Sequence, residues 1–528
     1  MPTPDPINHR LAAIRRQVTA GDFERARSLN HELLAEHPHH FGALLQRSRI
    51  ESSCGDYRQA RHYAALAHAA GPPRTTTEIS LLLRRLRTHN LIDLMQGAIA
   101  AIPPEQLHDP QLLDLIATLL NTSGAPEAAL AYAESGVRQF PGSIPLHLSK
   151  AQALMFLGRV EEDEEFLRDC LRKWPGLAFA WWMLSRLRRQ TPGSNHVAEL
   201  RRELSGASHP DDITFLAYAL HKELDDLGEV DDAYAALSLA CRTRRGQLDY
   251  YPAQDDRLFE QLRMFPTASA APSAEHGSLP VPIFVVGMHR SGTTLLEQHL
   301  NGHPDIHCAG ELYDFTSWMR YATNHHCTGE TDLEIVRRAA TVDFEEVGLG
   351  YLQSLDKLRG GERYVTDKLP TNFLNLGFIF RALPQAKVLH MVREPVETCF
   401  SNLREFFSES TALYSYDQIE LADHYRRYAG LMEHWHQRYP GRILDVSYND
   451  LILRPQATLR EISAHCGFEY RPQMLDTLVH SRGVNTASAI QVRSRPALPP
   501  TPKWLPYKAA LSPLIERLGA IASGAKRG

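Results

Sequence analysis

A short loop between a predicted strand and a predicted helix has the residue types that bind phosphate. The apolar run 281–286 is followed by 287–294, which reads GMHRSGTT, and then by a stretch of helical character. In such an arrangement the loop N–H groups converge on an anion, and the positive end of the helix adds to the attraction. The cation of the loop is Arg290, and Thr293 stands where the P-loop of nucleotide triphosphatases needs lysine. We therefore expect a phosphate site unlike that of an ATPase, and one that requires no metal.

A second apolar run also ends in a basic residue. Residues 386–392 read AKVLHMV and predict a strand, Arg393 follows directly, and Ser401 comes eight residues after Arg393. A guanidinium fork and a hydroxyl group are chemically suited to a phosphate dianion. We expect this pair to form a second phosphate contact.

Together these segments resemble the sulfotransferases that use 3′-phosphoadenylyl sulfate (PAPS). Residues 287–306 look like the family's 5′-phosphosulfate loop, and Arg393 with Ser401 is similar to its 3′-phosphate motif. The segment around Tyr448 and the C-terminal tail match as well, so the resemblance covers roughly residues 281–510 and is closest to protein-tyrosine sulfotransferases. It implies an α/β domain with a central parallel sheet, and PAPS as donor without a metal. The cofactor-binding residues that it implies are Arg290, Ser291, Gly292, Thr293, Thr294, Arg393, Ser401, Tyr448, Ser488 and Lys503.

The same resemblance implies the catalytic roles. Glu311 lies 21 residues after Arg290, an offset similar to that of the general base in the tyrosine-sulfating family. Lys368 matches the family lysine that contacts the bridging oxygen of the cofactor, and Arg290 shares the stabilisation of the developing charge. Many small-molecule sulfotransferases use a histidine base instead, so His307 and His390 are rivals for that role.

The first half of the chain repeats a helix–turn–helix pattern that resembles the tetratricopeptide repeat family. The run GDFERAR at 21–27 recurs as GDYRQAR at 55–61, an offset of 34 residues. A small alanine five residues after several turns lets two helices approach closely, although Asp163 takes that place in one repeat. Prolines such as Pro38 end the second helix of a pair. The predicted turns follow at spacings of 34 or 35 residues: Gly21, Gly55, Asn90, Gly124, Gly158, Gly193 and Gly228.

These patterns divide the chain into three parts. We expect an α-solenoid of about seven helix pairs over residues 1–265, a linker rich in Pro, Ala and Ser at 266–280, and the sulfotransferase domain over 281–528. The concave surface of a solenoid suits an extended chain, so the array is expected to bind a protein or peptide acceptor and to perform no chemistry. The sulfotransferase domain is expected to bind cofactor alone, and a homodimer is left open.

Composition narrows the class of protein. The 528 residues include 57 Lys and Arg against 62 Asp and Glu, a formal charge of −5, so no basic excess points to nucleic acid. Seven cysteines are scattered without a metal-ligand spacing, which suits a reducing compartment. No apolar stretch approaches the span of a bilayer, and the N-terminus lacks the apolar core of a signal peptide. We therefore expect a cytoplasmic protein with no membrane span.

The sequence predicts transfer of a sulfuryl group from PAPS to an acceptor hydroxyl, with tyrosine of a protein or peptide as the favoured acceptor. Sulfation of a glycan or small molecule is an alternative. A kinase-like nucleotide-binding protein with a repeat scaffold, and a scaffold with an inactive catalytic half, are the other two hypotheses.

Overall fold

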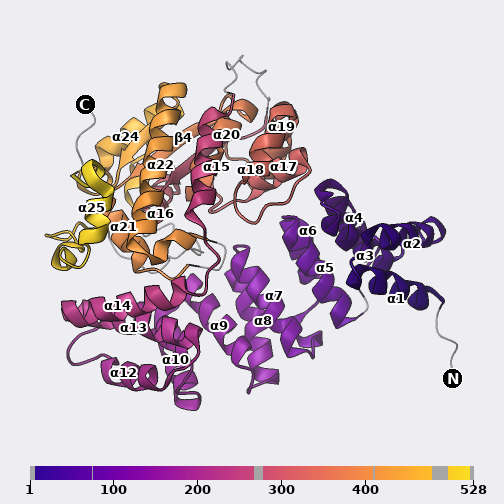
Figure 1. Cartoon of the computed structure of the whole chain (residues 1–528), viewed down its shortest axis with the longest axis horizontal. Helices are drawn as coiled ribbons and strands as arrows, with labels where there is room; N and C mark the ends of the chain where they lie inside the picture. The colour runs from indigo at the N-terminus through magenta and orange to yellow at the C-terminus, as the bar shows by residue number, and fades with distance from the viewer. Residues whose placement is uncertain (1–5, 74, 267–277, 408–410, 478–496, 524–528) are drawn as a thin grey trace. The chain divides into compact units, whose positions relative to one another are not determined.

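The chain forms two compact units, whose elements are labelled in Figure 1. The first unit consists of residues 1–153 together with 313–327 and 337–343, and the second of 154–312, 328–336 and 344–528. No helix in the described part of the chain is both long and apolar enough to cross a membrane. The computed structural model describes residues 6–73, 75–266, 278–407, 411–477 and 497–523.

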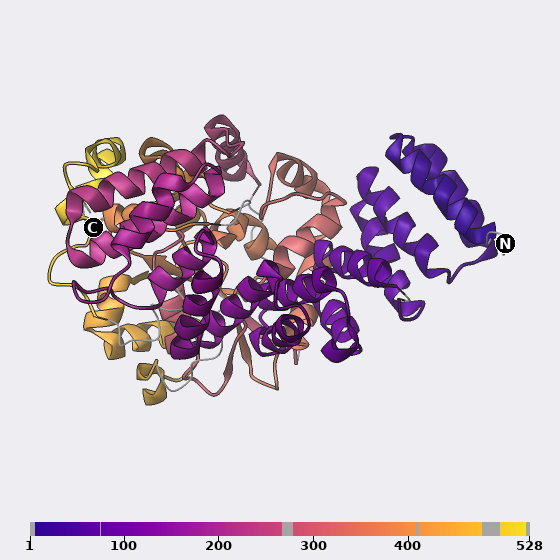
Figure 2. The same ribbon diagram turned by 90° about the horizontal axis from the view of Figure 1, so that it is seen from below.

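Successive antiparallel helices build the repeat array, and Figure 2 shows the indigo helices α1–α4 side by side. Helices α1 to α9 run Pro6–Thr19, Phe23–Glu36, Phe41–Ser53, Tyr57–Ala69, Thr76–Thr88, Ile92–Ala100, Pro110–Thr122, Pro126–Gln139 and Ile144–Leu157. Helices α10 to α15 run Val160–Lys173, Ala178–Leu187, Val197–Gly206, Pro210–Leu227, Val230–Arg245 and Pro252–Met264.

The expected turns lie between the helices, and six of the seven use a left-handed residue. The glycines at 21, 55, 124, 158 and 228 have φ between 73° and 81°, and Asn90 has φ 51°. Glycine and asparagine tolerate this conformation, which ends one helix and starts the next. Gly193 differs, because Thr191 and Ser194 pair with each other across it in an isolated bridge. The repeat pattern predicted from these residues is therefore present in the fold.

The small alanines of the pattern are buried, and one repeat departs from it. Ala60, Ala129 and Ala233 are fully buried, as close helix approach requires. Asp163 on α10 is equally buried, and neither of its carboxylate oxygens has a hydrogen-bond partner in the part of the chain that the structure describes. Burial, with a smaller contribution from the nearby Glu162, raises the pKa of Asp163 to about 8.

Helix α17 (Asp314–Thr323) belongs to the first unit and packs on the second repeat pair. The Arg58 side chain donates to the backbone carbonyls of Tyr321 at 2.7 Å and Ala322 at 2.6 Å. The backbone N–H of Arg58 donates to Oδ1 of Asn324 at 2.9 Å. Arg58 thereby contacts carbonyls in the last turn of α17, where the helical hydrogen-bond pattern ends.

A single parallel sheet lies in the second unit, with strand order β2-β3-β1-β4-β5. The strands are β1 Val281–Gly287, β2 Ile306–Cys308, β3 Tyr364–Asp367, β4 Lys387–Val392 and β5 Ile443–Ser447. Strand β1 is almost wholly buried, as expected for the central strand of such a sheet. Because all strands run in one direction, their carboxyl ends meet at one edge. The residues that follow the five strands there are Met288, Ala309, Lys368, Arg393 and Tyr448.

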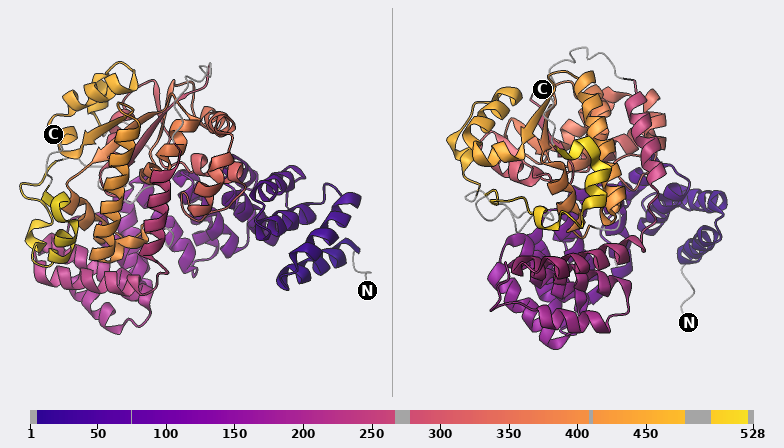
Figure 3. Two further views of the ribbon diagram at one scale, coloured as in Figure 1. Left: turned by 45° about the horizontal axis from the view of Figure 1, so that its top comes forward. Right: turned by 60° about the vertical axis from the view of Figure 1, so that its left-hand side comes forward.

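Helices cover the sheet of the second unit, and Figure 3 shows the long helix α22 beside the strands. Trp435 on α22 is fully buried, and its indole N–H donates to the carbonyl of Phe373 at 2.9 Å. A Cβ at Gly377 would come 2.8 Å from the Trp435 ring, so glycine permits this close packing. The helices are α16 Thr293–Leu300, α18 Leu333–Arg338, α19 Phe344–Asp356, α20 Leu376–Ala382, α21 Pro395–Leu403, α22 Gln418–Arg438, α23 Tyr448–Leu453, α24 Pro455–Cys466 and α25 Ser512–Leu518. Short 3-10 helices include η3 Pro370–Asn375 and η4 Leu413–Tyr416.

The predicted fold class, a helical repeat array followed by an α/β domain with a central parallel sheet, is confirmed. The expected linker at 266–280 falls largely on 267–277, outside the described residues. The domain limits 1–265 and 281–528 stay a prediction.

Candidate active site

The loop after β1 holds two residues in left-handed backbone conformations. Gly292, which precedes α16, has φ 110°, and a Cβ there would come 2.5 Å from Cδ2 of Tyr448. Arg290 has φ 66°, which a residue with a side chain adopts only at some cost in energy. Ser291 is buried, and its hydroxyl group has no partner among the described residues. The loop therefore brings backbone and an unsatisfied hydroxyl to the start of α16, whose first turn buries Thr293 and Thr294.

The structure brings the expected phosphate-binding side chains together. Nε of Arg290 donates to Oγ of Ser401 at 3.4 Å, and Nη1 of Arg393 donates to the backbone carbonyl of Arg290 at 3.3 Å. The Arg393 guanidinium carbon lies 4.4 Å from the centre of the Tyr448 ring. Nη2 of Arg393 is 3.0 Å from Oε1 of Glu397. Two guanidinium groups, a hydroxyl and an aromatic ring thus occupy one region at the carboxyl end of β4.

Lys503 adds a further cation to this region. Lys503 is exposed, yet the protein around it displaces enough water to lower its pKa, and the nearby Arg404 lowers it further. The carboxylates Asp225 and Glu397 oppose that effect, so the amine lies among charges of both signs. The expected contact Ser488 lies outside the described residues.

The proposed base and the proposed lysine form an ion pair. Nζ of Lys368 lies 2.7 Å from Oε1 of Glu311. The Lys368 side chain is 1% exposed and that of Glu311 is 33% exposed, so the carboxylate is the partner that solvent reaches. Lys368 follows β3 directly and Glu311 lies three residues beyond β2, which pairs with β3. Adjacent parallel strands thereby place the two side chains within contact of each other.

A buried glutamate that sequence reasoning missed holds the loop in front of Glu311. Oε1 of Glu297, on α16, accepts hydrogen bonds from the Gly310 N–H at 3.0 Å and from the Thr366 hydroxyl at 2.7 Å. The backbone N–H of Lys368 donates to the Gly310 carbonyl at 2.9 Å. Gly310 is therefore fixed through both of its backbone polar groups, which restrains the position of Glu311.

Comparison with known proteins decides what kind of domain this is. Residues 282–472 match the sulfotransferase family, and this span contains the loop 287–292, Glu311, Lys368 and Arg393. The match is confined to residues 282–472 of the 528, so the similarity applies to this part of the chain. The resemblance stated from the sequence is thereby confirmed.

Several relatives share part of this chain. Protein-tyrosine sulfotransferase 2 of Gallus gallus is 21% identical over 258 residues, which cover 45% of this chain and 68% of the relative. Protein-tyrosine sulfotransferase 1 of Danio rerio is 21% identical over 257 residues, which cover 45% of this chain and 71% of the relative. An uncharacterized protein of Aquifex aeolicus is 29% identical over 311 residues, which are 57% of this chain and only 41% of that protein. A solved sulfotransferase from Alicyclobacillus acidocaldarius is 21% identical with a TM-score of 0.28, covering 46% of this chain and 95% of its own.

The phosphate loop of the sulfotransferase domain also contains a histidine that sequence reasoning did not single out. His289 is partly buried, and its Nδ1 lies 3.2 Å from the Tyr414 hydroxyl. Burial lowers the pKa of His289 to about 4, and Lys368 adds to that effect while Glu311 opposes it. His289 is therefore neutral near neutral pH and lies close to the Glu311–Lys368 pair. Its place inside the motif GMHRSGTT was the available signal in the sequence.

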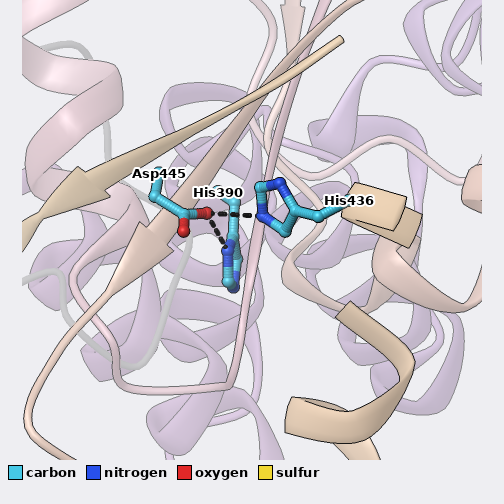
Figure 4. Close-up of side chains that lie close together, drawn as sticks. All are labelled: His390, His436 and Asp445. Atoms are coloured by element: carbon cyan, nitrogen blue, oxygen red, sulfur yellow. Dashed lines mark hydrogen bonds and ion pairs between the residues drawn. The ribbon is translucent and has the colours of Figure 1, made fainter. Parts of the chain in front are cut away.

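His390, one of the rival bases, belongs to a hydrogen-bonded cluster shown in Figure 4. Nδ1 of His390 lies 2.7 Å from Oδ1 of Asp445, and Nε2 of His436 lies 2.9 Å from the same oxygen. Partial desolvation of the largely exposed Asp445 carboxylate would raise its pKa, but hydrogen bonds from the two imidazoles outweigh that effect and lower the pKa. The other ring nitrogen of His390 contacts the Tyr428 hydroxyl. Both nitrogens of His390 are thus engaged in this cluster.

The same three residues are the one group in the described ranges with three potential metal-ligand atoms within 4.8 Å. Contacts of 2.7 and 2.9 Å are hydrogen-bond lengths. Ligands of a tetrahedral zinc with bonds of about 2.0 Å lie about 3.3 Å apart. The arrangement is therefore that of a hydrogen-bonded cluster. His307, the second rival base, lies on β2 with its Nδ1 4.0 Å from Oε1 of Glu362.

A buried glutamate directly after α21 reaches the phosphate loop. Oε2 of Glu405 lies 3.7 Å from Nη1 of Arg290, and both side chains are 6% exposed. Burial lowers the pKa of Arg290, and Glu405 opposes that effect. Glu405 was not among the residues expected from the sequence, because no motif marks it.

Proposed function

We propose that this chain transfers a sulfuryl group from PAPS to the hydroxyl group of an acceptor, which is a tyrosine of a protein or peptide. The observation that carries the proposal is the Glu311–Lys368 pair, 2.7 Å apart, next to a phosphate-type loop in a sulfotransferase-family domain. A carboxylate and an ammonium group at one point suit a reaction that removes a proton and releases a phosphate.

The residues present fit the two ends of PAPS. The buried Ser291 hydroxyl, which has no partner among the described residues, and the backbone at Gly292 suit the 5′ end together with Arg290. Arg393 and Ser401 suit the 3′-phosphate, since a guanidinium fork pairs with phosphate oxygens. When bound, PAPS supplies the phosphosulfate from which the sulfuryl group is transferred.

The roles follow from the charges. Glu311, the more exposed member of its ion pair, takes the proton of the acceptor hydroxyl while that oxygen forms a bond to sulfur. The bond between sulfur and the bridging phosphate oxygen breaks, and Lys368 with Arg290 offsets the negative charge that the departing phosphate gains. Neutral His289 neighbours this pair and adds no competing charge.

We assign binding of the acceptor to the repeat array. Stacked helix pairs present an extended surface able to hold a polypeptide segment, which agrees with a protein or peptide substrate.

The test compares donors. Full-length protein is incubated with PAPS or ATP and a tyrosine-containing peptide, in the presence of either Mg²⁺ or EDTA, and group transfer is followed with ³⁵S or ³²P label. We expect ³⁵S in the peptide despite EDTA and no ³²P transfer. Transfer of ³²P from ATP that depends strictly on Mg²⁺ would replace this proposal by the kinase hypothesis. Parallel assays with glycans and a small phenol test the acceptor.

A further inference from the structure

The last repeats and the segment after α21 are packed together within the second unit. The ring of Phe406 lies 4.6 Å from that of Phe215 on α13 and 5.9 Å from that of Trp182 on α11, between centres. The Tyr218 hydroxyl donates to the carbonyl of Leu403 at 3.2 Å. Residues 403–406, which lie at the end of the helix that carries Ser401 and just beyond it, are therefore held by side chains of the repeats.

An arginine of the repeats shares Glu405 with the phosphate loop. Nη1 of Arg186, on α11, lies 2.5 Å from Oε1 of Glu405, and Nη2 lies 3.4 Å from Oε2. The contact from Glu405 to Arg290 is longer, at 3.7 Å. The Arg186 guanidinium is also stacked 4.4 Å from the centre of the Trp182 ring, one helical turn earlier. Glu405 is thus engaged most closely by a cation that lies outside the sulfotransferase-family domain.

A second set of contacts joins α13 to the same segment. Nε of Arg404 donates to Nε2 of His221 at 3.1 Å, so that nitrogen carries no proton and Nδ1 donates to the Ala233 carbonyl at 2.8 Å. Arg404 also pairs with Asp225, whose other oxygen accepts from the Tyr507 hydroxyl at 2.6 Å. Burial lowers the pKa of His221 to about 4, which agrees with its neutral form.

We propose that Arg186 is a positioning residue for cofactor binding, acting through Glu405. By holding the Glu405 carboxylate, it prevents that carboxylate from closing on Arg290 and neutralising the cation of the phosphate loop. A buried carboxylate that loses its partner pairs with the nearest remaining cation, because an unpaired buried charge is costly. Arg290, already 3.7 Å from Glu405, is in reach to become that partner. The inference rests on the proposed function, since it assumes that Arg290 binds the cofactor.

The experiment measures the affinity of the full-length chain for adenosine 3′,5′-bisphosphate by calorimetry. Arg186→Met removes the charge but keeps the aliphatic stem that lies along Trp182, and we expect it to weaken binding about tenfold or more. Arg186→Lys keeps a cation near Glu405 and should stay within about threefold of the wild type. Arg188→Ala is the matched control, because Arg188 on the same repeat pairs with Glu161 and Glu164 within the array. The Arg188→Ala variant should bind adenosine 3′,5′-bisphosphate as the wild type does.

The decisive variant combines Arg186→Met with Glu405→Gln. Removing the carboxylate as well as its partner takes away the charge that would close on Arg290, so affinity should return to within about threefold of the wild type. A purely structural role of Arg186 predicts instead that the second change adds a further loss. Unchanged binding by Arg186→Met, an equal loss with lysine, or no recovery in the double variant overturns the inference. Absence of binding by the wild type overturns the proposed function itself, and the inference with it.

Discussion

Among the described residues, the two arginines of the proposed cofactor site each lie beside a carboxylate of the same compact unit. Arg393 pairs with Glu397 at 3.0 Å, and Arg290 lies 3.7 Å from Glu405. A phosphate that binds competes with these carboxylates for the same guanidinium groups. The affinity of this site for phosphate therefore depends on the groups that bind these carboxylates as well as on the arginines themselves.

At the residue scale, Arg393 and Ser401 should select the 3′-phosphate. Loss of both side chains, as Arg393→Ala with Ser401→Ala, is expected to weaken adenosine 3′,5′-bisphosphate far more than AMP, which lacks the 3′-phosphate. The reason is that a guanidinium pairs best with a doubly charged phosphate. Calorimetric titration with both nucleotides measures the difference. Equal losses for the two nucleotides would mean that the pair supports the fold and does not read the 3′-phosphate.

The site residues that follow apolar strands could be predicted from the sequence, whereas those contributed by distant parts of the chain could not. Lys368 and Arg393 directly follow strands, and Arg290 lies three residues after one, at the edge where a parallel sheet places its binding residues. Arg186 and Glu405 are 219 residues apart in the chain, and no local pattern marks a pair at that separation. Such contacts depend on how elements dock, which the local sequence does not encode.

At the scale of elements, the loop before α16 depends on the glycine at 292. Gly292→Ala places a Cβ 2.5 Å from the Tyr448 ring at φ 110°, so the loop or the ring must move. We expect a loss of affinity for adenosine 3′,5′-bisphosphate of about tenfold or more, because backbone strain of this kind is worth about 1–3 kcal/mol.

The control for that variant is Gly21→Ala. Gly21 has φ 77°, but no atom lies within 4 Å of the position that a Cβ would take, so the variant carries only the backbone cost. Because Gly21 lies in the repeat array, nucleotide affinity should match the wild type, while thermal stability falls slightly. If both alanine variants bind normally, the close approach of Gly292 to Tyr448 has no part in binding.

The buried Asp163 on α10 should make stability depend on pH. Its folded-state pKa of about 8 lies above the usual value, so the folded state prefers the protonated form. The stabilisation is fully present below about pH 4 and is lost as pH rises through about 8. Asp163→Ala restores the alanine of the repeat pattern and removes this loss. The variant should therefore gain in melting temperature over the wild type as pH rises from 5 to 8.

Calorimetric melting of both proteins across that range tests the prediction. Each pKa unit corresponds to about 1.4 kcal/mol, so the difference should reach several kcal/mol at pH 8, reduced by the cavity that alanine leaves. Melting curves that differ by the same amount at every pH would show that Asp163 does not titrate between these values.

Turns between helices could be predicted from the sequence where a single residue determines the backbone conformation. Six turns of the array follow from a glycine or an asparagine in the left-handed conformation, whereas Gly193 lies in a bridged turn that the spacing alone did not reveal. The docking of α17 through Arg58 was not foreseen, since its contacts are backbone carbonyls that any sequence possesses.

At the scale of the whole molecule, the repeats do not form one body apart from the sulfotransferase domain. Residues 154–265 cluster with the sheet in the second unit, whereas residues 1–153 cluster in the first together with 313–327. Side chains from α11 and α13 contact residues 403–405 within the second unit. A chain that begins at 281 lacks those side chains. We therefore propose that cofactor binding needs the later repeats, in place of the expectation from the sequence that the sulfotransferase domain binds cofactor alone.

The most direct test of the central claim measures turnover and nucleotide affinity in a Glu311→Gln variant of the full-length chain. Transfer of ³⁵S from PAPS to a tyrosine peptide should fall about a hundredfold or more, because the amide cannot accept the hydroxyl proton. Affinity for adenosine 3′,5′-bisphosphate should stay within about threefold, since Arg290, Arg393 and Ser401 are unchanged. Full turnover by the glutamine variant would contradict the account and move the search for the base to His307 and His390.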